Sequence, residues 1–519
     1  MKNIKGLSYL LLIVLFSFNL SFCQSYKGLA DKDTLEKNLS TLASDEFMGR
    51  ETASEGEKLA SDYICKQLSS NGIIPFGDND TYLQSFNVYV NGYETTSSFS
   101  IKYNNNDSFT LKYADDYLIY PPSYAPENFS VSNTDIVFAG YGITAEEYKY
   151  DDYADLDVSG KVVLVLSGEP ESADDNFFDG GYVTTYSEVQ SKLSRAKELG
   201  ALALISLPDS DELKEYPHKR RKVLKTNFSL EENEPVTKRK SILPHYLLNL
   251  NGAQKIVLNK LNSITQFTDI KIIRRIFSTN EFPLKLSANY SLKKINEIRR
   301  ANNIIGMLLG TDPDLSDEFI AVGAHYDHLG TRNGIVFNGA DDNGSGTVAV
   351  LELARLFSEK KENHRPILFI LHTGEEKGLL GSKYLSANSE FVKNIESYIN
   401  LDMIGREDEN TIYSIGSDKI STEYHDLIES VNNETLKLNF DYSFDSPGDP
   451  NRYYYRSDHY NYAKRDIPIV FFYDHMEQDY HKPTDDVDKI NFNKIAKITD
   501  LVYNILLRVS NLDHELEKN

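Results

Sequence analysis

Cysteine is scarce in this chain of 519 residues, which contains only Cys23 and Cys65. Cys23 ends an N-terminal segment in which Lys2 and Lys5 precede an apolar run, 7–20, a pattern typical of an export signal. Loss of this signal, which we expect to span residues 1–23, leaves Cys65 alone. An internal disulfide is thereby excluded, and stability must come from the core or from metals.

Long apolar runs are also missing after the N-terminal one. That run is shorter than the roughly 20 residues that a membrane-spanning helix needs, so we expect no transmembrane segment. A lipoprotein signal would lipidate Cys23, but the residue before such a cysteine is normally small and here is Phe22. We therefore expect a periplasmic or extracellular protein without a lipid anchor.

Positive charge is in short supply, because 55 Lys and Arg face 78 Asp and Glu, for a net charge of −23. Without Lys2 and Lys5 the mature chain stands at −23 − 2 = −25. This charge opposes binding to nucleic acid or to anionic lipid. Repeats and low-complexity tracts are not apparent either, so we expect a globular protein of more than one domain.

Two patterns of secondary structure alternate along the chain. Residues 33–68 have helical periodicity, and short strands and turns follow Pro75. Residues 113–281 have a pattern of their own, in which strands at 135–139, 161–166 and 201–207 flank a helix at 187–199. We expect a small α/β or β-rich domain at 113–281, inserted between two parts, 24–112 and 282–519, of a larger domain.

The larger domain is predicted to be α/β. Buried-type strands at 319–323, 367–371, 397–401 and 467–472 alternate with helices, one of them at 347–357. This alternation predicts a mainly parallel mixed sheet that helices cover on both faces.

Titratable residues follow these strands one after another, and open α/β sheets bind ligands beyond the carboxyl ends of their strands. The candidates are His325 and Asp327, then Asp342 in a turn that opens a helix, then Glu375 and Glu376, Asp402, and finally Tyr480 and His481. Singly, each has a plainer explanation: Asp342 could cap a helix, and paired glutamates are usually solvated. Chance does not explain five such groups at successive strand ends.

Imidazole nitrogen and carboxylate oxygen are the ligands that zinc prefers in near-tetrahedral sites. If one carboxylate bridges two zinc ions about 3.5–4 Å apart, the pair can hold one hydroxide and polarise a peptide carbonyl. A free carboxylate is then needed to manage the proton. The adjacent Glu375 and Glu376 supply one ligand and one base.

At these residues the sequence resembles the cocatalytic zinc aminopeptidases, a family that includes bacterial leucyl aminopeptidases, yeast vacuolar aminopeptidase, glutamate carboxypeptidase and the transferrin receptor. The resemblance covers 303 to about 506, and the stretch 42–50 also looks like exported members. Its motifs are Gly323-Ala324-His325-Tyr326-Asp327, Gly339-Ala340-Asp341-Asp342-Asn343-Gly344-Ser345-Gly346, Gly374-Glu375-Glu376-Lys377-Gly378, Leu401-Asp402-Met403, Arg456-Ser457-Asp458-His459 and Tyr480-His481. His328 is a variation that the family tolerates.

The resemblance implies two zinc ions per chain. His325 and Asp402 would bind one, Glu376 and His481 the other, and Asp342 would bridge them. Glu375 would be the general base. Three further roles are implied: Asp327 would accept a hydrogen bond from the second nitrogen of His325, Tyr480 would donate to the oxyanion, and Arg456 would lie near the substrate. A cis peptide after Asp342 and a protease-associated domain at 113–281 are implied as well.

The predicted function is therefore an exported aminopeptidase that acts on peptides. A carboxypeptidase or dipeptidase would use the same metals, and Arg452 or Arg456 could bind a terminal carboxylate. A metal-free receptor remains the alternative from another class, although every ligand position is filled. Glutaminyl cyclase is a further alternative on the same scaffold, but it usually works with one zinc, and the complete bridging set disfavours it. A zincin and a serine hydrolase are excluded, because neither His-Glu-x-x-His nor Gly-x-Ser-x-Gly occurs.

Overall fold

The computed structural model describes residues 28–103, 107–174, 176–180, 182–231, 242–261, 269–279, 284–332, 334–406, 408–446, 448–475 and 478–519. The predicted signal segment, with Lys2, Lys5 and Cys23, lies outside the described residues. Among the described residues, no helix combines the length and the apolar character needed to cross a membrane.

The chain divides into two compact units. Unit 1 comprises residues up to Ser85 together with Ala301–Asn519, and unit 2 comprises Phe86–Arg300. Two long strands, β2 (Leu83–Tyr103) and β12 (Leu284–Leu308), have residues in both units. Unit 2 thus extends beyond the predicted insertion, 113–281, at both ends. The reason is that Phe99 and Ile101 of β2 and Leu286 and Ala288 of β12 belong to the hydrophobic core of unit 2.

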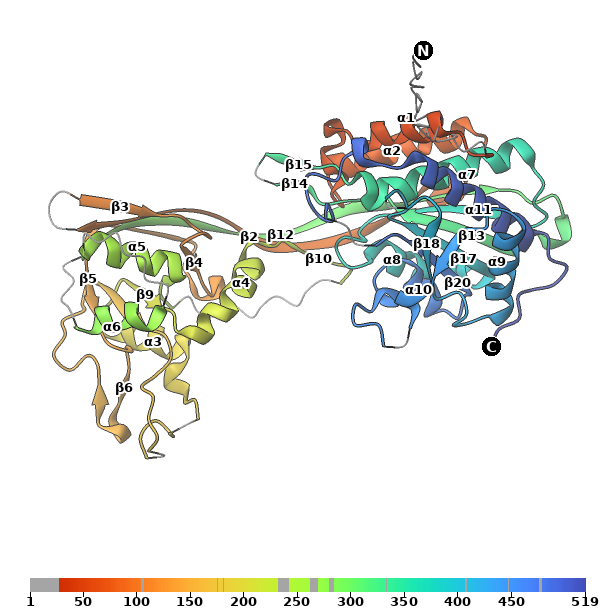
Figure 1. The fold of residues 1–519 in the computed structure, drawn as a ribbon. Coiled ribbons are helices and arrows are strands. Elements are labelled where there is room, and N and C mark those ends of the chain that lie inside the picture. Colours follow the sequence, from red (N-terminus) through yellow and green to blue (C-terminus); the bar gives the residue numbers. More distant parts are fainter. Residues whose placement is uncertain are drawn as a thin grey trace, which may run out of the picture. The chain divides into compact units, whose positions relative to one another are not determined.

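Unit 1 is a mixed α/β domain, which confirms the predicted fold class (Figure 1). Its sheet runs in the order β19-β18-β20-β17-β13-β16-β12, and β17, β13 and β16 are parallel neighbours, as are β17 and β20. The strands are β1 (Ile74–Pro75), β13 (Phe319–His325), β16 (Ile367–His372), β17 (Ile395–Asp402), β18 (Thr411–Ile415), β19 (Asn439–Asp441) and β20 (Ile469–Tyr473), with a separate hairpin of β14 (Gly330–Arg332) and β15 (Ile335–Phe337).

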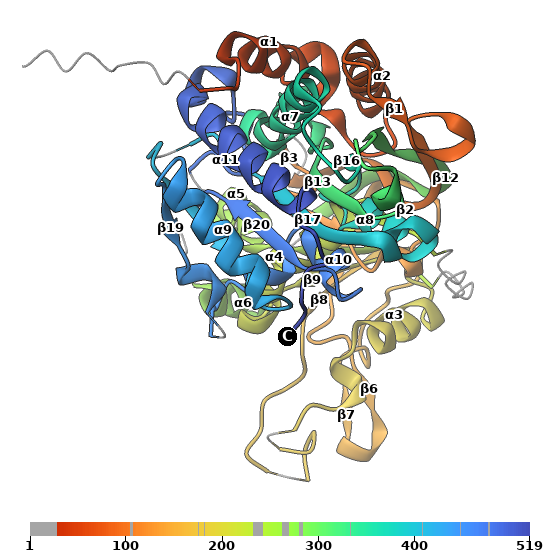
Figure 2. The same ribbon diagram turned by 90° about the vertical axis from the view of Figure 1, so that its right-hand side faces the viewer.

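Helices cover this sheet on both faces, as predicted (Figure 2). They are α1 (Lys32–Leu42), α2 (Glu55–Ser70), α7 (Gly346–Lys360), α8 (Leu380–Asn388), α9 (Thr422–Glu434), α10 (His459–Ala463) and α11 (Phe492–Ser510). Side chains alternate along a strand, so Ile320 and Val322 of β13 pack with α1, α7 and α11, while Phe319 and Ala321 pack with α8 and α10. Each large aliphatic side chain buried in this way contributes roughly 1.5–3 kcal/mol.

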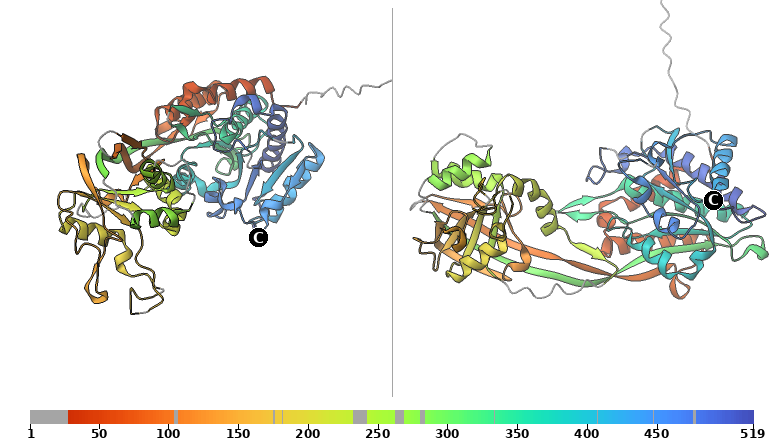
Figure 3. Two further views of the ribbon diagram at one scale, coloured as in Figure 1. Left: turned by 60° about the vertical axis from the view of Figure 1, so that its left-hand side comes forward. Right: turned by 90° about the horizontal axis from the view of Figure 1, so that it is seen from below.

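Unit 2 is also α/β. Its strands β5 (Asn128–Phe138), β8 (Val162–Leu166), β9 (Ala203–Leu207) and β11 (His245–Leu248) are parallel neighbours, and β4 (Tyr117–Ile119) joins β11 in the antiparallel sense. Its helices are α3 (Val189–Glu198), α4 (Ser210–Leu224), α5 (Leu250–Leu261) and α6 (Ile270–Thr279). Figure 3 shows these helices, in yellow and green, beside the strands of the unit. The predicted strands at 161–166 and 201–207 and the helix between them are confirmed.

Short strands complete unit 2. They are β3 (Asp107–Leu111), which pairs with β2, β10 (Asn227–Ser229), which also pairs with β2, and a hairpin of β6 (Thr144–Ala145) and β7 (Tyr150–Asp151). The short strands expected after Pro75 are in fact one long continuous strand, β2. Polar residues at 91–98 interrupt the hydrophobic pattern without interrupting the pairing, because backbone hydrogen bonds hold a strand whatever its side chains.

Candidate metal centre

Parallel strands bring the predicted ligands to one edge of the unit 1 sheet. His325 is the last residue of β13 and Asp402 the last of its neighbour β17, while Glu376 follows β16 and His481 follows β20. Because the carboxyl ends of parallel strands lie at the same edge, these four side chains converge although 156 positions separate the first from the last.

Asp342 reaches the same place from the turn Ala340–Ser345, which leads into α7. The peptide bond between Asp342 and Asn343 is cis, as the resemblance implied. Asp485 fixes this turn, because its carboxylate accepts hydrogen bonds from the backbone N–H groups of Asp341 at 3.0 Å and Asp342 at 3.0 Å. The bridging candidate is therefore held by its backbone, and its carboxylate is left for other partners.

The first ligand group consists of His325, Asp342 and Asp402. His325 Nε2 lies 3.5 Å from Asp342 Oδ1 and 3.3 Å from Asp402 Oδ1. Ligand atoms at zinc bond lengths of about 2.0–2.1 Å in a tetrahedron stand about 3.3 Å apart. The three atoms are therefore spaced as zinc ligands would be.

The second group lies on the other oxygen of Asp342. His481 Nε2 is 3.3 Å from Asp342 Oδ2 and 3.1 Å from Glu376 Oε2. A further imidazole is present here, because His328 Nδ1 lies 2.9 Å from Glu376 Oε1 and 3.8 Å from Asp342 Oδ2. The two oxygens of Asp342 thus face two separate sets of donors, which is the arrangement that a bridging carboxylate requires.

The donor set fits zinc. Asp342 Oδ2 and Glu376 Oε1 are buried and have no hydrogen-bond partner among the described residues. A buried carboxylate oxygen without a partner costs free energy, and a cation removes that cost. Imidazole and carboxylate donors in groups of this size are those of zinc sites.

The carboxylates and imidazoles shift one another's pKa values. Burial raises the pKa of Asp342, and the neighbouring charge of Glu376 raises it further. For Glu376 the burial penalty is outweighed by His328 and His481, which hold its pKa well below the usual range. Burial lowers the pKa of His481, yet Asp342 and Glu376 bring it up to about 10. The cluster therefore attracts positive charge strongly.

Glu375 differs from the five ligand candidates beside it. Its Oε2 is 4.0 Å from His325 Nε2, outside the two ligand groups, and its side chain is 14% exposed. Burial raises the pKa of Glu375 well above the usual range, against the opposing charge of His325. A carboxyl of raised pKa at the edge of a metal cluster is suited to accept and return a proton.

Asp327 does not make the contact that the resemblance implied. Its carboxylate is 3.7 Å from His325 Nδ1, and that nitrogen lies instead 3.1 Å from the backbone carbonyl of Asp327. The carboxylate accepts from the hydroxyl of Thr52 at 2.8 Å and from the backbone N–H of Glu375 at 3.2 Å. The carboxylate of Asp327 thus holds the backbone N–H of Glu375, while the backbone carbonyl of Asp327 contacts His325.

A cavity opens over the cluster. It is lined by Asp342, Glu375, Asp402, Met403, Tyr453, Arg456, Ser457, Phe471, Tyr473, Tyr480 and His481. The ring of Tyr480 stacks on His481 with 3.8 Å between centroids, and burial raises the pKa of Tyr480, so its hydroxyl keeps its proton at neutral pH. Arg456 is exposed, and its guanidinium lies 5.0 Å from the ring of Tyr453. Of the three consecutive tyrosines, 453–455, only Tyr453 is among the lining residues.

Sequence reasoning gave no roles to several residues that hold the ligands. Ser457 donates its hydroxyl to Asp402 Oδ2 at 2.7 Å, leaving Oδ1 toward His325. Asp458 is fully buried beside it, and burial raises its pKa to about 7. The motif Arg456-Ser457-Asp458-His459 contains both residues, but the sequence did not indicate what they contact.

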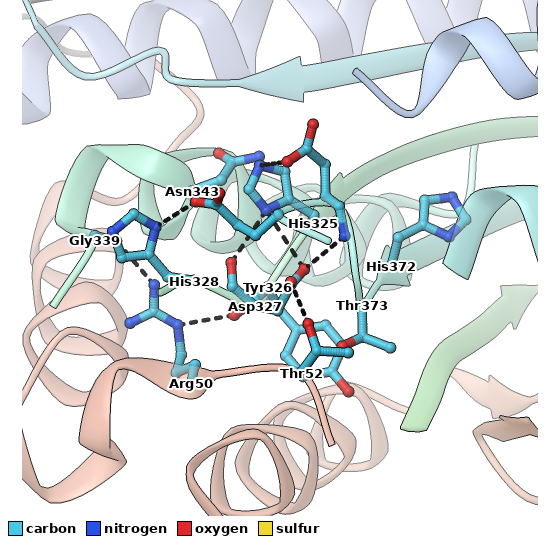
Figure 4. A network of polar contacts seen from close by, with 12 residues as sticks. Arg50, Thr52, His325, Tyr326, Asp327, His328, Gly339, Asn343, His372 and Thr373 are labelled. Carbon is cyan, nitrogen blue, oxygen red and sulfur yellow. Dashed lines mark hydrogen bonds and ion pairs between the residues drawn. The ribbon is translucent and has the colours of Figure 1, made fainter. Parts of the chain in front are cut away.

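Arg50 ties the N-terminal segment to two ligand loops. It is 0% exposed and donates to four backbone carbonyls, those of Tyr326 at 2.8 Å, Leu42 at 2.7 Å, Asn338 at 2.6 Å and Gly339 at 2.9 Å. Figure 4 shows Arg50 below this network, with Thr52 and Asp327 beside it. Tyr326 directly follows His325, and Gly339 begins the turn that carries Asp342, so one guanidinium connects both ligand groups.

Residues 303–506 match Peptidase family M28. A probable leucine aminopeptidase of Trichophyton verrucosum is 31% identical over 201 residues, which are 37% of this chain and 54% of that protein. A probable leucine aminopeptidase of Arthroderma otae is 32% identical over 205 residues, again 37% and 54%. The chain thus spans about half the length of the curated relatives it matches.

Two solved structures are similar over most of both chains. An aminopeptidase from Aneurinibacillus sp. strain AM-1 is 20% identical, with a TM-score of 0.46 over 92% of this chain and 93% of that one. A zinc aminopeptidase from Bacillus subtilis is also 20% identical, with a TM-score of 0.46 over 93% and 96%.

The matched family segment does not include 113–281, so the resemblance of the inserted domain to a protease-associated domain stays a prediction. Every predicted ligand, from His325 to His481, lies inside that segment. The predicted family resemblance is therefore confirmed for residues 303–506, which match Peptidase family M28.

Proposed function

We propose that the protein is a two-zinc aminopeptidase. The observation that carries this proposal is the position of Asp342, whose Oδ1 lies 3.5 Å from His325 Nε2 and whose Oδ2 lies 3.3 Å from His481 Nε2. One zinc would be held by His325 and Asp402 and the other by Glu376 and His481, with Asp342 shared. Bound zinc supplies Lewis-acid polarisation of a carbonyl oxygen and lowers the pKa of water.

Glu375 is the general base of the proposed reaction. It stands beside both ligand groups, and its backbone N–H is held by Asp327 at 3.2 Å. Its carboxylate takes a proton from the attacking water and gives it to the leaving amine. Tyr480 keeps its hydroxyl proton and can donate it as a hydrogen bond to the oxygen that becomes negative. Stacking on the ring of His481 holds the ring of Tyr480 in place.

The similarity to leucine aminopeptidases supports action at the amino terminus of peptides. Among the charged residues that line the cavity, the carboxylates Asp342, Glu375 and Asp402 outnumber the one arginine, which favours a substrate ammonium. The second candidate function is a carboxypeptidase or dipeptidase, which one observation favours: Arg456 lines the same cavity and could pair with a substrate carboxylate. A metal-free receptor is disfavoured, because all five ligand positions carry competent side chains.

A peptide panel separates these functions. Purified protein is incubated with free peptides, N-acetylated peptides and C-amidated peptides, and products are read by mass. We expect stepwise loss of N-terminal residues from free and amidated peptides and none from acetylated ones. Loss of residues from acetylated peptides would contradict the aminopeptidase proposal, and a requirement for a free carboxyl terminus would favour the second candidate.

The base is tested by Glu375→Gln, which removes the proton acceptor and keeps the size of the side chain. We expect kcat to fall by about two to four orders of magnitude, the usual contribution of a positioned acid or base. Zinc content should stay at the wild-type value. An unchanged kcat would exclude this role for Glu375.

We further propose that the protein is exported, on the basis of the apolar run 7–20 behind Lys2 and Lys5. N-terminal sequencing of protein recovered from the periplasm or the medium should give a start near Gln24. Recovery of the intact N-terminus from the cytoplasm would contradict the proposal.

A further inference from the structure

Unit 2 contains a cavity of about 170 Å³ that the proposed function does not use. Its polar and charged lining comes from β6, from the residues before α3 and from α3 itself (Figure 1): Thr144, Thr185, Tyr186, Ser191, Lys192 and Arg195. None of the described residues that line it is acidic, although the chain as a whole has a net charge of −23. A cavity that is lined by cations and lacks carboxylates attracts an anion.

Lys192 brings a buried positive charge to this cavity. It is 2% exposed, and its Nζ donates to the backbone carbonyls of Tyr141 at 2.6 Å, Leu166 at 3.2 Å and Gly168 at 2.5 Å. These neutral groups satisfy its three N–H groups but not its charge, and no carboxylate of the described residues forms an ion pair with Nζ. Burial lowers the pKa of Lys192 to about 7, which the charge of Asp152 opposes only in part. Because a buried charge without a counterion is costly, an anion in the cavity would be stabilised.

Arg195 offers the direct contact for such an anion. It follows Lys192 by three residues on α3, so both side chains lie on the same face of the helix. Its Nε donates to the hydroxyl of Thr144 at 3.1 Å and its Nη1 to Glu198 Oε2 at 3.3 Å, which fixes the plane of the guanidinium. Nη2 has no hydrogen-bond partner among the described residues. The side chain of Glu198 is 66% exposed and does not line the cavity, so it neutralises Arg195 only weakly.

We propose that this cavity binds a small oxyanion, either the carboxylate of an amino acid or peptide terminus or an inorganic phosphate, which Arg195 binds through Nη2 and Lys192 stabilises by its charge. One water occupies roughly 30 Å³ in the liquid, so the cavity has room for about five waters, enough for a carboxylate with its α-carbon or for one phosphate. All of these residues belong to unit 2, and the site is therefore independent of the metal centre in unit 1.

Titration calorimetry on the whole protein tests the site with three probes. N-acetyl-L-alanine has a free carboxylate, N-acetyl-L-alaninamide has none, and inorganic phosphate is the third. We expect N-acetyl-L-alanine, phosphate or both to bind and the amide not to bind, and the two oxyanion probes distinguish the source of the ligand. Each titration is repeated after metal has been removed with a chelator, because binding at the metal centre would then disappear and binding in unit 2 would remain.

Two variants and one control locate the binding. Arg195→Gln should weaken oxyanion binding by about 10–100-fold, the usual effect of losing a hydrogen bond to a charged group. Lys192→Met should weaken it by a similar factor; circular dichroism checks that this variant is folded, and Arg195→Gln decides the test if it is not. Lys219 is the matched control, since it lines a neighbouring cavity of unit 2 with Lys192 but is already paired with Glu212. Lys219→Met should leave the affinity unchanged.

Three results would overturn the proposal. If neither oxyanion binds the metal-stripped wild type, or if the amide binds as tightly as the free acid, the cavity is not an oxyanion site. If Arg195→Gln binds as tightly as wild type, the guanidinium does not contact the ligand. If Lys219→Met loses as much affinity as Arg195→Gln, binding reflects general attraction to cations. Failure of the proposed two-zinc function would leave these titrations unchanged, because they do not require zinc.

Discussion

Replacement of Arg50 by methionine tests whether one guanidinium holds both ligand loops. Its side chain is 0% exposed and donates to four backbone carbonyls. Burial lowers the pKa of Arg50 to about 10, so it is charged at neutral pH. Methionine fills most of the space but removes one donor from each of the four carbonyl oxygens, of which that of Gly339 keeps the backbone N–H of Gly344 at 3.2 Å.

A buried acceptor left without its partner costs about 1–3 kcal/mol, and some relaxation is expected. We therefore expect Arg50→Met to lower the free energy of unfolding by about 3–5 kcal/mol, as loss of a partner from a buried charged network usually does. Arg50→Lys keeps the charge but has three donors in place of five, and should lose about half as much. We also expect Arg50→Met to weaken zinc binding, because Tyr326 adjoins His325 and Gly339 adjoins the turn that carries Asp342.

The assay is urea unfolding followed by circular dichroism, with and without zinc. The transition that zinc shifts to higher urea reports on unit 1. Arg365 supplies a matched control: it is 2% exposed and donates to the backbone carbonyls of Ser510 and His514, distant in sequence from the ligands. Arg365→Met should cost stability alone, whereas Arg50→Met should also weaken zinc. A loss below about 1 kcal/mol in Arg50→Met, or unchanged zinc affinity, would show that Arg50 does not hold both ligand loops.

Three further changes have defined outcomes. Asp485→Ala removes the acceptor of two backbone N–H groups next to Asp342, so zinc affinity should fall by about 10–100-fold in chelator competition; equal affinity would contradict this. Gly339 has φ of +57°, and an added Cβ would approach Asp342 O to 2.2 Å, so Gly339→Ala should lower the unfolding temperature and Gly334→Ala, in open space, much less. Burial raises the pKa of Glu57 to about 7, so its stabilising effect is complete below about pH 4.5 and lost as pH rises through 7. The wild type should lose about 3 kcal/mol across that window relative to Glu57→Gln, and parallel profiles would exclude the shift.

The sequence predicts unit 1 well because its strands are short, apolar on both faces and followed at once by polar residues. β13, β16, β17 and β20 were each located to within two residues at either end. Their parallel arrangement then brings residues such as His325 and Asp402 to one edge without further information. Four of the five ligand candidates follow these strands, whereas Asp342 lies in the turn before α7, and the choice of the five as ligands came from the family resemblance.

The supporting contacts could not be predicted in the same way. Arg50 donates to backbone carbonyls, and every residue has one, so no sequence signal marks its partners. His328 stands next to a recognised motif, but whether its ring turns toward Glu376 depends on how the loop after β13 meets the turn at Gly339. The long strand β12 was missed for a related reason: six of its residues 293–300 are polar or charged, and the two isoleucines among them do not alternate as in a strand with one apolar face, although the strand continues through them.

The most direct test of the two-zinc site is an anomalous difference map at the zinc absorption edge from crystals of the zinc-loaded protein. We expect two peaks about 3.5–4 Å apart, with Asp342 bonded to both. One peak should contact His325 and Asp402, and the other Glu376 and His481. A single peak, or a second peak that does not contact Asp342, would contradict the shared-carboxylate site on which the proposed function depends.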